Sequence, residues 1–334
     1  MTQTYNESFL EAITHGLQGL LHEWEIPETG VVSLLNISEN ATFVAHDPES
    51  GKKIILRVHR PAYHTRQEIE SELIWIDSLR EQKIVRTAAP LELTSGGRIA
   101  SFAHDGAERL VVGFEFLPGD EPLMNNDLTA DFYTLGSVTA RLHEHVKSWA
   151  TPVGFKRKVW DFDSMLGQGP LWGDWRDAMG LDDKGQAVLE ETADVLARDL
   201  DAFGSQADRF GLVHADLRLA NLLVGQGELS VIDFDDCGYS WFMYDFAAAI
   251  SFMEEDEQIP VLKDSWVKGY RSVAYLSPEE EQSIPMFIML RRILLTAWLA
   301  SHRETETAQQ LGQTYTQGTV RLAQIYLNTS TIFS

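Results

Sequence analysis

The chain has 334 residues, of which 44% are hydrophobic and 23% are charged, so it is long enough for two packed lobes and is not dominated by disorder. Its 50 Asp and Glu residues outnumber 27 Lys and Arg residues, and the formal charge of −23 disfavours nucleic acid and anionic membranes as partners and mildly favours cationic small molecules. Solubility alone is the simpler explanation of this charge. The single cysteine, Cys237, excludes an internal disulfide and a cysteine-rich zinc site and fits a reducing compartment.

Apolar spacing predicts a leading helix followed by an antiparallel sheet. Phe9, Ile13 and Leu17 recur at helical period, and Pro27 ends this segment. Runs rich in Val, Ile and Leu predict strands, and the turn-forming residues between them predict hairpins. The expected strands cover residues 31–37, 41–46, 53–59, 98–103 and 110–117, and one helix over 65–82 is expected to cross the sheet. A linker is indicated at Pro118-Gly-Asp120, so we predict an N-lobe over residues 1–117.

The second part of the chain, residues 118–334, is predicted to be a mainly helical lobe. Helical periods cover residues 128–146, 186–203, 244–254, 261–275, 279–302 and a last segment from 304. Two stretches interrupt this pattern: residues 154–175, which are rich in Gly, Trp and Asp, and a hairpin of 221–224 with 229–233. Function is expected to concentrate in such irregular stretches.

No secretory or membrane-spanning segment is expected. Residues 1–24 are polar and then amphipathic, without the basic start and apolar run of a signal peptide. The longest apolar stretch, 284–300, is interrupted by Arg291 and Arg292. We therefore predict a cytoplasmic protein without a membrane partner, and the sequence gives no prediction of oligomeric state.

The strongest functional signal is His214-Ala-Asp-Leu-Arg-Leu-Ala-Asn221, followed after one hairpin by Val231-Ile-Asp-Phe-Asp235. An Asp that orients a hydroxyl, an Asn five positions on and an Asp on the next strand are what transfer of a γ-phosphoryl group requires, because catalysis there is mostly positioning and charge neutralisation. Pairing of the hairpin strands would bring Asn221 and Asp233 together. Mg²⁺ prefers such oxygen ligands together with nucleotide phosphates.

These residues also have a simpler structural explanation. Asp216 could cap a turn, and Asn221 could satisfy local backbone amides. The further presence of Asp233 favours a metal site, because clustered carboxylates repel one another without a cation. We expect Asp235 to be a further metal ligand or to support one, and Arg218 to neutralise the transferred phosphate.

Two stretches carry a resemblance to a known family. Leu56-Arg-Val-His-Arg-Pro61 and Val213-His-Ala-Asp-Leu-Arg-Leu-Ala-Asn-Leu-Leu223 resemble the aminoglycoside phosphotransferase and choline kinase-like superfamily, most closely its branch of homoserine kinase-like and bacterial stress-response kinases. The resemblance covers nearly the whole chain, tightly in the catalytic loop and loosely over residues 120–200. It implies an α+β, bilobal protein-kinase-like fold, with an antiparallel N-lobe sheet, a crossing helix and a mainly helical C-lobe. It also implies ATP and Mg²⁺ as cofactors.

The resemblance assigns roles in the second lobe residue by residue. Asp216 resembles the catalytic Asp, and Asn221 and Asp233 resemble the metal-binding pair. The motif at Asp233 reads Asp-Phe-Asp rather than Asp-Phe-Gly, so a switching activation loop is not expected. Asp245 resembles the Asp that braces the catalytic loop, and His214 is expected to anchor that loop through hydrogen bonds.

In the first lobe, Arg57 stands at the strand position where kinases carry the phosphate-gripping Lys. Arg can grip two phosphate oxygens through its planar fork. Lys53 is the alternative, although a solvated turn residue is the better explanation for it, and Glu72 of the crossing helix is the expected partner of Arg57. No Gly-rich loop precedes the strand, so Ser38, Asn40 and backbone amides would meet the phosphates.

Three further features bear on ligands. The backbone of Glu115 and Leu117 is expected to hydrogen-bond adenine at an inter-lobe hinge. Aromatic residues of 155–175, interleaved with aspartates, could cage an ammonium group, although core packing is the simpler explanation for each tryptophan. Arg291 or Arg292 could bind a carboxylate or phosphate, with a satisfied helix charge as the commoner alternative.

The sequence therefore predicts a kinase that transfers the γ-phosphoryl group of ATP, with Mg²⁺, to a hydroxyl of a small molecule: an amino alcohol, hydroxy-amino acid or aminosugar. An atypical Ser/Thr protein kinase of the stress-response type is the alternative, and it is disfavoured because Asp245 follows Asp233 without a long activation segment. A non-catalytic nucleotide-binding module would be expected to have lost Asp216, Asn221 or Asp233, and all three are present.

Overall fold

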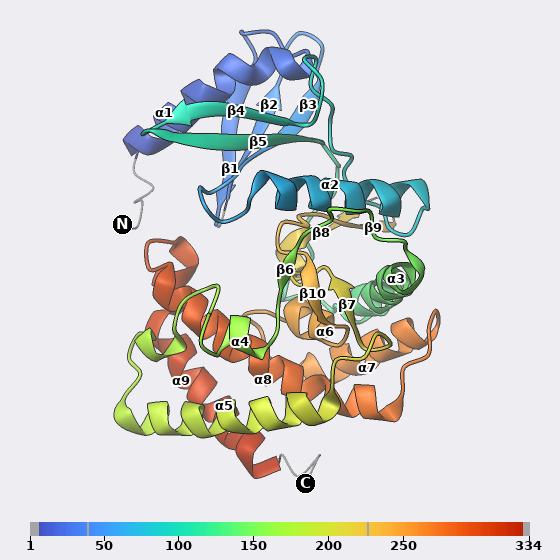
Figure 1. Ribbon diagram of the computed structural model, residues 1–334, viewed down its shortest axis with the longest axis vertical. Helices are drawn as coiled ribbons and strands as arrows, with labels where there is room; N and C mark the ends of the chain where they lie inside the picture. The colour runs from blue at the N-terminus through green and yellow to red at the C-terminus, as the bar shows by residue number, and fades with distance from the viewer. Residues whose placement is uncertain (1–6, 39, 226, 330–334) are drawn as a thin grey trace. The chain divides into compact units, whose positions relative to one another are not determined.

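The computed structural model describes three stretches of the chain: residues 7–38, 40–225 and 227–329 (Figure 1). The chain divides into two compact units. Unit 1 comprises Met1–Pro118 with Pro152–Lys156, and unit 2 comprises Gly119–Thr151 with Arg157–Ser334. Unit 1 contains an antiparallel sheet and unit 2 is mainly helical, so the predicted α+β class is confirmed.

Unit 1 is built on a five-stranded antiparallel sheet with the strand order β1-β2-β3-β5-β4. Its elements are α1 (Glu7–Leu20), η1 (Leu21–Trp24), β1 (Val31–Ile37), β2 (Ala41–His46), β3 (Lys53–Val58), α2 (Arg66–Glu81), β4 (Ile99–His104) and β5 (Ala107–Glu115). The turn between β2 and β3 contains Asp47, whose Oδ1 accepts the Glu49 amide at 3.0 Å. This is the local bond that makes Asp a turn former.

The two faces of this sheet have different partners. α1 and η1 cover one face (Figure 1), where Ile13 and Trp24 share a buried core with Phe43 and Leu56. Side chains alternate along a strand, so Arg57, next to Leu56 on β3, points to the opposite face. The sheet thereby separates an apolar core from a face that carries a buried charge.

The helix α2 begins at a capping box. Thr65 Oγ1 accepts the Glu68 amide at 3.3 Å, and Glu68 Oε2 accepts the Thr65 amide at 2.7 Å, so two unpaired amides of the first turn are satisfied. This cap fixes where the helix starts, and with it the face of α2 on which Glu72 lies. Glu72 is fully buried, at 0% exposure.

Unit 2 contains short strands among longer helices. The strands form a three-stranded sheet β6-β10-β7 and the hairpin β8-β9, with bounds β6 (Lys158–Val159), β7 (Phe210–Val213), β8 (Leu222–Gly225), β9 (Glu228–Val231) and β10 (Gly238–Trp241). The helices are α3 (Thr129–Ser148), α4 (Phe162–Met165), η2 (Trp175–Asp177), α5 (Asp183–Phe203), η3 (Leu219–Asn221), α6 (Tyr244–Ala249), α7 (Ile259–Arg271), α8 (Pro278–Ser301) and α9 (Glu306–Thr329).

Two glycines allow α3 and α7 to pack closely. A Cβ on Gly136 would lie 2.0 Å from a carbonyl oxygen of α7, and one on Gly269 would lie 1.9 Å from a carbonyl oxygen of α3. Any larger residue at either position would therefore force the helices apart. This contact fixes the positions of His143 on α3 and Tyr270 on α7, which meet near the candidate site.

Among the described residues, α8 is the one helix that is long and apolar enough to cross a membrane. However, 89% of its apolar 18-residue window is buried inside the protein, as expected of a core helix. The interrupting residues Arg291 and Arg292 are also buried, each at 2% exposure.

The helix predicted over residues 244–254 is too long. In the structure α6 ends at Ala249, and Phe252 has a φ of 69°. A non-glycine residue in this left-handed region cannot continue a right-handed helix. Apolar residues continue at helical spacing past this break, so the sequence pattern alone predicts a longer helix than the structure contains.

Candidate active site

The loop after β7 carries Asp216. β7 ends at Val213, and Ala215 has a φ of 66°, a left-handed conformation that costs a non-glycine residue about 1–3 kcal/mol. Asp245, in the first turn of α6, stabilises this turn: its Oδ1 accepts the Ala215 amide at 2.8 Å, and its Oδ2 accepts the His214 amide at 3.3 Å. One buried carboxylate thus holds the backbone on which Asp216 lies.

Asp245 is itself held by α3 and α7. His143 Nε2 lies 3.1 Å from Asp245 Oδ2, and His143 Nδ1 lies 3.0 Å from the Tyr270 hydroxyl. Burial lowers the pKa of His143 and outweighs the opposite effect of Asp245, so the imidazole is neutral. The glycine crossing of α3 and α7 therefore positions the side chains that orient Asp245.

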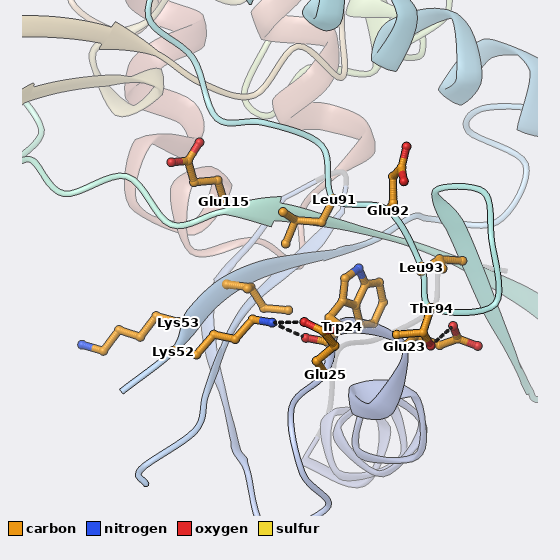
Figure 2. Close-up of a pocket in the computed structure, with 11 residues that line it drawn as sticks. Glu23, Trp24, Glu25, Lys52, Lys53, Leu91, Glu92, Leu93, Thr94 and Glu115 are labelled. Carbon is orange, nitrogen blue, oxygen red and sulfur yellow. Dashed lines mark hydrogen bonds and ion pairs between the residues drawn. The ribbon is translucent and has the colours of Figure 1, made fainter. Parts of the chain in front are cut away.

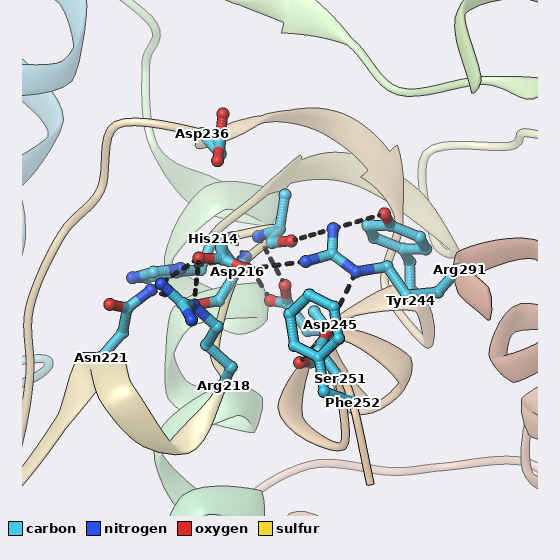
Figure 3. A network of polar contacts seen from close by, with 12 residues as sticks. His214, Asp216, Arg218, Asn221, Asp236, Tyr244, Asp245, Ser251, Phe252 and Arg291 are labelled. Atoms are coloured by element: carbon cyan, nitrogen blue, oxygen red, sulfur yellow. Dashed lines mark hydrogen bonds and ion pairs between the residues drawn. The ribbon is translucent and has the colours of Figure 1, made fainter. Parts of the chain in front are cut away.

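The Asp216 carboxylate has hydrogen-bond donors on two sides (Figure 3). Its Oδ1 accepts Arg291 Nη2 at 2.6 Å, and its Oδ2 accepts Asn221 Nδ2 at 2.7 Å and Arg218 Nε at 3.3 Å. Burial by itself would raise the pKa of Asp216, but the charges of Arg218 and Arg291 outweigh it and hold the pKa below its usual value. The carboxylate is therefore ionised, the state that accepts a hydrogen bond from a hydroxyl.

Asn221 and Asp233 are brought together by the β8–β9 hairpin, as the strand pairing predicted. The amide of Ile232 donates to the Asn221 carbonyl at 2.9 Å, and Asp233 is the next residue. Asn221 Nδ2 also donates to the Asp216 carbonyl at 2.8 Å, and Figure 3 shows the Asn221 side-chain oxygen turned away from Asp216. The Asp233 side chain is exposed, and its φ of 60° is left-handed.

Asp235 has a different environment from Asp233. Its side chain is only 4% exposed. The buried Arg157 donates to the backbone carbonyls of Asp235 and Cys237, the latter at 2.7 Å. These bonds, and not a glycine hinge, define the path of the chain after Asp233.

In unit 1, Arg57 and Glu72 form a buried ion pair. Arg57 Nη2 lies 2.6 Å from both Glu72 carboxylate oxygens, and the guanidinium lies 4.9 Å from the centroid of the Phe114 ring. Arg57 is 4% exposed. A buried charge is tolerated only when it is paired, so each residue depends on the other.

The other nucleotide-binding candidates are also in unit 1. Asn40 is 6% exposed, and its Oδ1 accepts the Arg60 amide at 3.1 Å. The Glu115 amide donates to the Ala89 carbonyl at 2.8 Å, so this amide is not available to adenine. Leu117 lies beyond the end of β5 and is half-buried.

A pocket of about 430 Å³ lies in unit 1 on the side of the sheet that η1 covers (Figure 2). Trp24 and Ile54 form an apolar wall, and Lys52 Nζ donates to the Trp24 carbonyl at 2.7 Å. The Glu115 side chain also lines it, whereas Arg57 does not. Since Arg57 points to the opposite face of the sheet, this pocket is separate from the predicted phosphate contact.

The three tryptophans of residues 155–175 are buried in unit 2, with exposures of 1% for Trp160, 5% for Trp172 and 1% for Trp175. Trp160 and Trp172 make an edge contact at 5.1 Å between ring centroids. The face of Trp172 is covered by the Arg291 guanidinium at 5.1 Å, and that of Trp175 by Arg176 at 4.2 Å. The protein's own arginines thus occupy two of the rings proposed to cage an ammonium group, and core packing is the correct explanation for these residues.

Comparison with known proteins places the chain in a family. The sequence model of the phosphotransferase enzyme family matches residues 33–276. A structure of a microcompartment-associated aminopropanol kinase is 42% identical, with a TM-score of 0.86 over 93% of this chain and 97% of that one. An amicoumacin kinase in complex with AMP-PNP, Ca²⁺ and Ami is 24% identical, with a TM-score of 0.75 over 98% and 97% of the two chains. Amicoumacin kinase of Bacillus subtilis (strain 168) is 26% identical over 273 residues, 78% of this chain and 77% of that protein.

The chain belongs to the phosphotransferase enzyme family, so the resemblance seen in the sequence is confirmed. Its fold is the kinase-like fold that the resemblance implied. The protein is an ATP-dependent small-molecule kinase.

Proposed function

We propose that the phosphoryl acceptor is the hydroxyl of a small amino alcohol. The observation that carries this proposal is the ionised Asp216 carboxylate: a carboxylate has about four acceptor sites, and three donors occupy it here. The Asp216 carboxylate can therefore accept one more hydrogen bond, and the hydroxyl of the acceptor can donate it. The 42% identity to a protein named as an aminopropanol kinase and the formal charge of −23 support an acceptor with a cationic amine.

The lone cysteine, which is buried, supports a cytoplasmic location.

The proposed reaction uses Asp216 and Arg218 together. Asp216 orients the acceptor hydroxyl toward the γ-phosphorus and accepts its proton as the new P–O bond forms and the bond to the leaving ADP breaks. Since such transition states are loose, orientation contributes more than early removal of the proton. Arg218, whose Nε lies 3.3 Å from Asp216 Oδ2, neutralises charge on the transferred group.

We assign a divalent cation site to Asn221, Asp233 and Asp235. The donor set fits Mg²⁺, because an amide oxygen and carboxylates are the hard ligands that this ion prefers. The side-chain oxygen of Asn221 points away from Asp216 (Figure 3), which supports its assignment as a ligand. When bound, Mg²⁺ would neutralise negative charge on the nucleotide phosphates.

We assign nucleotide binding to residues 1–117 and catalysis to residues 118–334. In the first region the proposed contacts are made by Asn40, Arg57, Glu72, Glu115 and Leu117. Arg57 would grip phosphate oxygens while Glu72 holds its guanidinium, which the bond lengths of 2.6 Å support. At Glu115 the adenine contact would be made by the carbonyl.

Removing the Asp233 side chain is expected to remove the gain in ATP affinity that Mg²⁺ provides. Asp233→Ala should weaken Mg-ATP binding by at least about tenfold, because the cation would lose a charged ligand. Titration of ATP with and without Mg²⁺ measures the effect, and EDTA should reduce wild-type affinity to the same level.

Asp233→Gly is the matched control for backbone strain at a φ of 60°. Glycine adopts this conformation freely, whereas alanine does not. If both variants lose the Mg²⁺ effect, the side chain is responsible. Normal binding by the glycine variant would remove Asp233 from the metal site.

The acceptor class is tested by paired alcohols that differ only in the amine. Aminopropanol should be phosphorylated with a kcat/KM at least about 100-fold above that of isopropanol, because a site built for an ammonium group leaves its own charges unpaired with the neutral analogue. Coupled measurement of ADP release, with ethanolamine, serine, an aminosugar and a generic protein substrate in parallel, gives the comparison. Equal rates for the pair, or turnover with the protein substrate alone, would contradict the proposal.

A further inference from the structure

Arg291 is a buried cation whose hydrogen bonds converge on the catalytic loop (Figure 3). It is 2% exposed on the apolar helix α8, where an unpaired charge would be very costly. Its guanidinium donates to Asp216 Oδ1 at 2.6 Å, to the Ala215 carbonyl at 3.2 Å, to the Tyr244 hydroxyl at 2.9 Å and to Ser251 Oγ at 3.1 Å. One side chain therefore joins α8 to the loop, to α6 and to the segment that follows α6.

The two oxygens of Asp216 are divided between different donors. Arg291 occupies Oδ1 from α8, and Asn221 and Arg218 occupy Oδ2 from within the loop. A carboxylate held at both oxygens cannot rotate about its Cβ–Cγ bond without breaking at least one charge-assisted hydrogen bond. Without Arg291, only the residues of the loop itself would fix the plane of the Asp216 carboxylate.

The guanidinium of Arg291 is itself held in place. Its carbon lies 5.1 Å from the ring centroid of Trp172 and 5.6 Å from that of Tyr244. Burial raises the pKa of the Tyr244 hydroxyl to about 12, so it stays neutral beside the cation. The planar guanidinium of Arg can stack on an aromatic ring and donate several hydrogen bonds in its plane at the same time, whereas the ammonium group of Lys cannot.

We infer that Arg291 is a positioning residue for the phosphoryl-transfer step: it fixes the Asp216 carboxylate in the orientation that receives the acceptor hydroxyl. The inference rests on the proposed role of Asp216 as the group that binds that hydroxyl. Arg291 does not need to touch substrate, since its effect is carried by Asp216. Its loss should therefore reduce kcat and leave the KM values for ATP and acceptor unchanged.

The neighbouring Arg292 provides a matched control. It is equally buried on the same helix, but its guanidinium contacts Glu254 at 2.6 Å, Thr319 at 2.9 Å and the Tyr315 carbonyl at 3.1 Å. Substitution of either arginine disturbs a buried ion pair of α8, and only one of them holds Asp216. A purely structural role would make the two variants alike.

The test compares Arg291→Lys, Arg291→Ala and Arg292→Lys with the wild type, with aminopropanol as acceptor and each rate normalised to the folded fraction. We expect kcat of Arg291→Lys to fall roughly 10- to 100-fold, since misplacement of a reacting group by about 1 Å can cost about 100-fold in rate, while Arg292→Lys keeps the wild-type kcat. Added guanidinium chloride at millimolar concentration should restore part of the kcat of Arg291→Ala, and lysine should retain more activity than alanine.

The inference is overturned if Arg291→Lys has the wild-type kcat, if both lysine variants lose kcat equally, or if KM for the acceptor rises while kcat stays constant. These results differ from failure of the proposed function, in which the wild type itself transfers no phosphoryl group to the amino alcohol. Should Arg291→Ala not fold, the comparison of the two lysine variants decides the matter alone.

Discussion

Asp216→Asn is expected to lower turnover by about 10³-fold and to leave the affinity for Mg-ATP unchanged, because a neutral amide can neither take the hydroxyl proton nor orient it as a carboxylate does. Asparagine is nearly isosteric, and its oxygen can still accept the Arg291 hydrogen bond, which is 2.6 Å long in the wild type. Its NH2 group cannot accept the hydrogen bonds from Asn221 and Arg218, but Asp245 still holds the loop backbone at Ala215. The loop should therefore keep its path. Steady-state turnover and a separate ATP titration measure the two quantities independently.

Asp208→Asn is a suitable control for this substitution. Asp208 belongs to the same unit, and its carboxylate lies 3.8 Å from Arg209 on the surface. The control removes one negative charge without touching the loop, so its turnover should equal that of the wild type. Unchanged turnover in Asp216→Asn would refute the catalytic assignment, and loss of ATP affinity would place Asp216 in nucleotide binding.

Arg57→Met is expected to have the largest effect in unit 1. It leaves the fully buried Glu72 carboxylate without its cation, and removal of one partner of a buried pair costs roughly 3–5 kcal/mol of unfolding free energy. ATP affinity should fall as well, because the proposed phosphate contact is lost. Urea denaturation and the KM for ATP measure the two effects.

The double substitution Arg57→Met with Glu72→Leu separates stability from binding. Replacing both members of a buried ion pair by apolar residues is often neutral for stability. The double variant should therefore recover most of the unfolding free energy but none of the ATP affinity. Recovery of both would show that Arg57 is structural and does not contact phosphate.

Local patterns in the sequence were sufficient to predict most of the fold. The strand Ala41–His46 was predicted with its observed bounds, because its alternating burial shows directly in the apolar pattern. The contact between Asp216 and Asn221 spans five residues, and loop spacing alone indicates it. Family resemblance supplied the pairing of Arg57 with Glu72, which depends on how a helix crosses the sheet.

The contacts that support the site could not be predicted in the same way. Arg291 is 75 residues from Asp216, and His143 is 102 residues from Asp245. Each contact depends on the packing of whole helices, which no local period encodes. The sequence did mark Arg291 as unusual, since a charge within an apolar helix needs a partner, but it did not identify Asp216 as that partner.

Direct identification of the phosphorylated product tests the central proposal most directly. The wild-type enzyme is incubated with Mg-ATP and aminopropanol, and the products are analysed by mass spectrometry and phosphorus NMR. We predict one equivalent of O-phosphorylated aminopropanol for each ADP formed. Formation of ADP with inorganic phosphate alone, phosphorylation on the amine, or absence of any phosphorylated amino alcohol would contradict it.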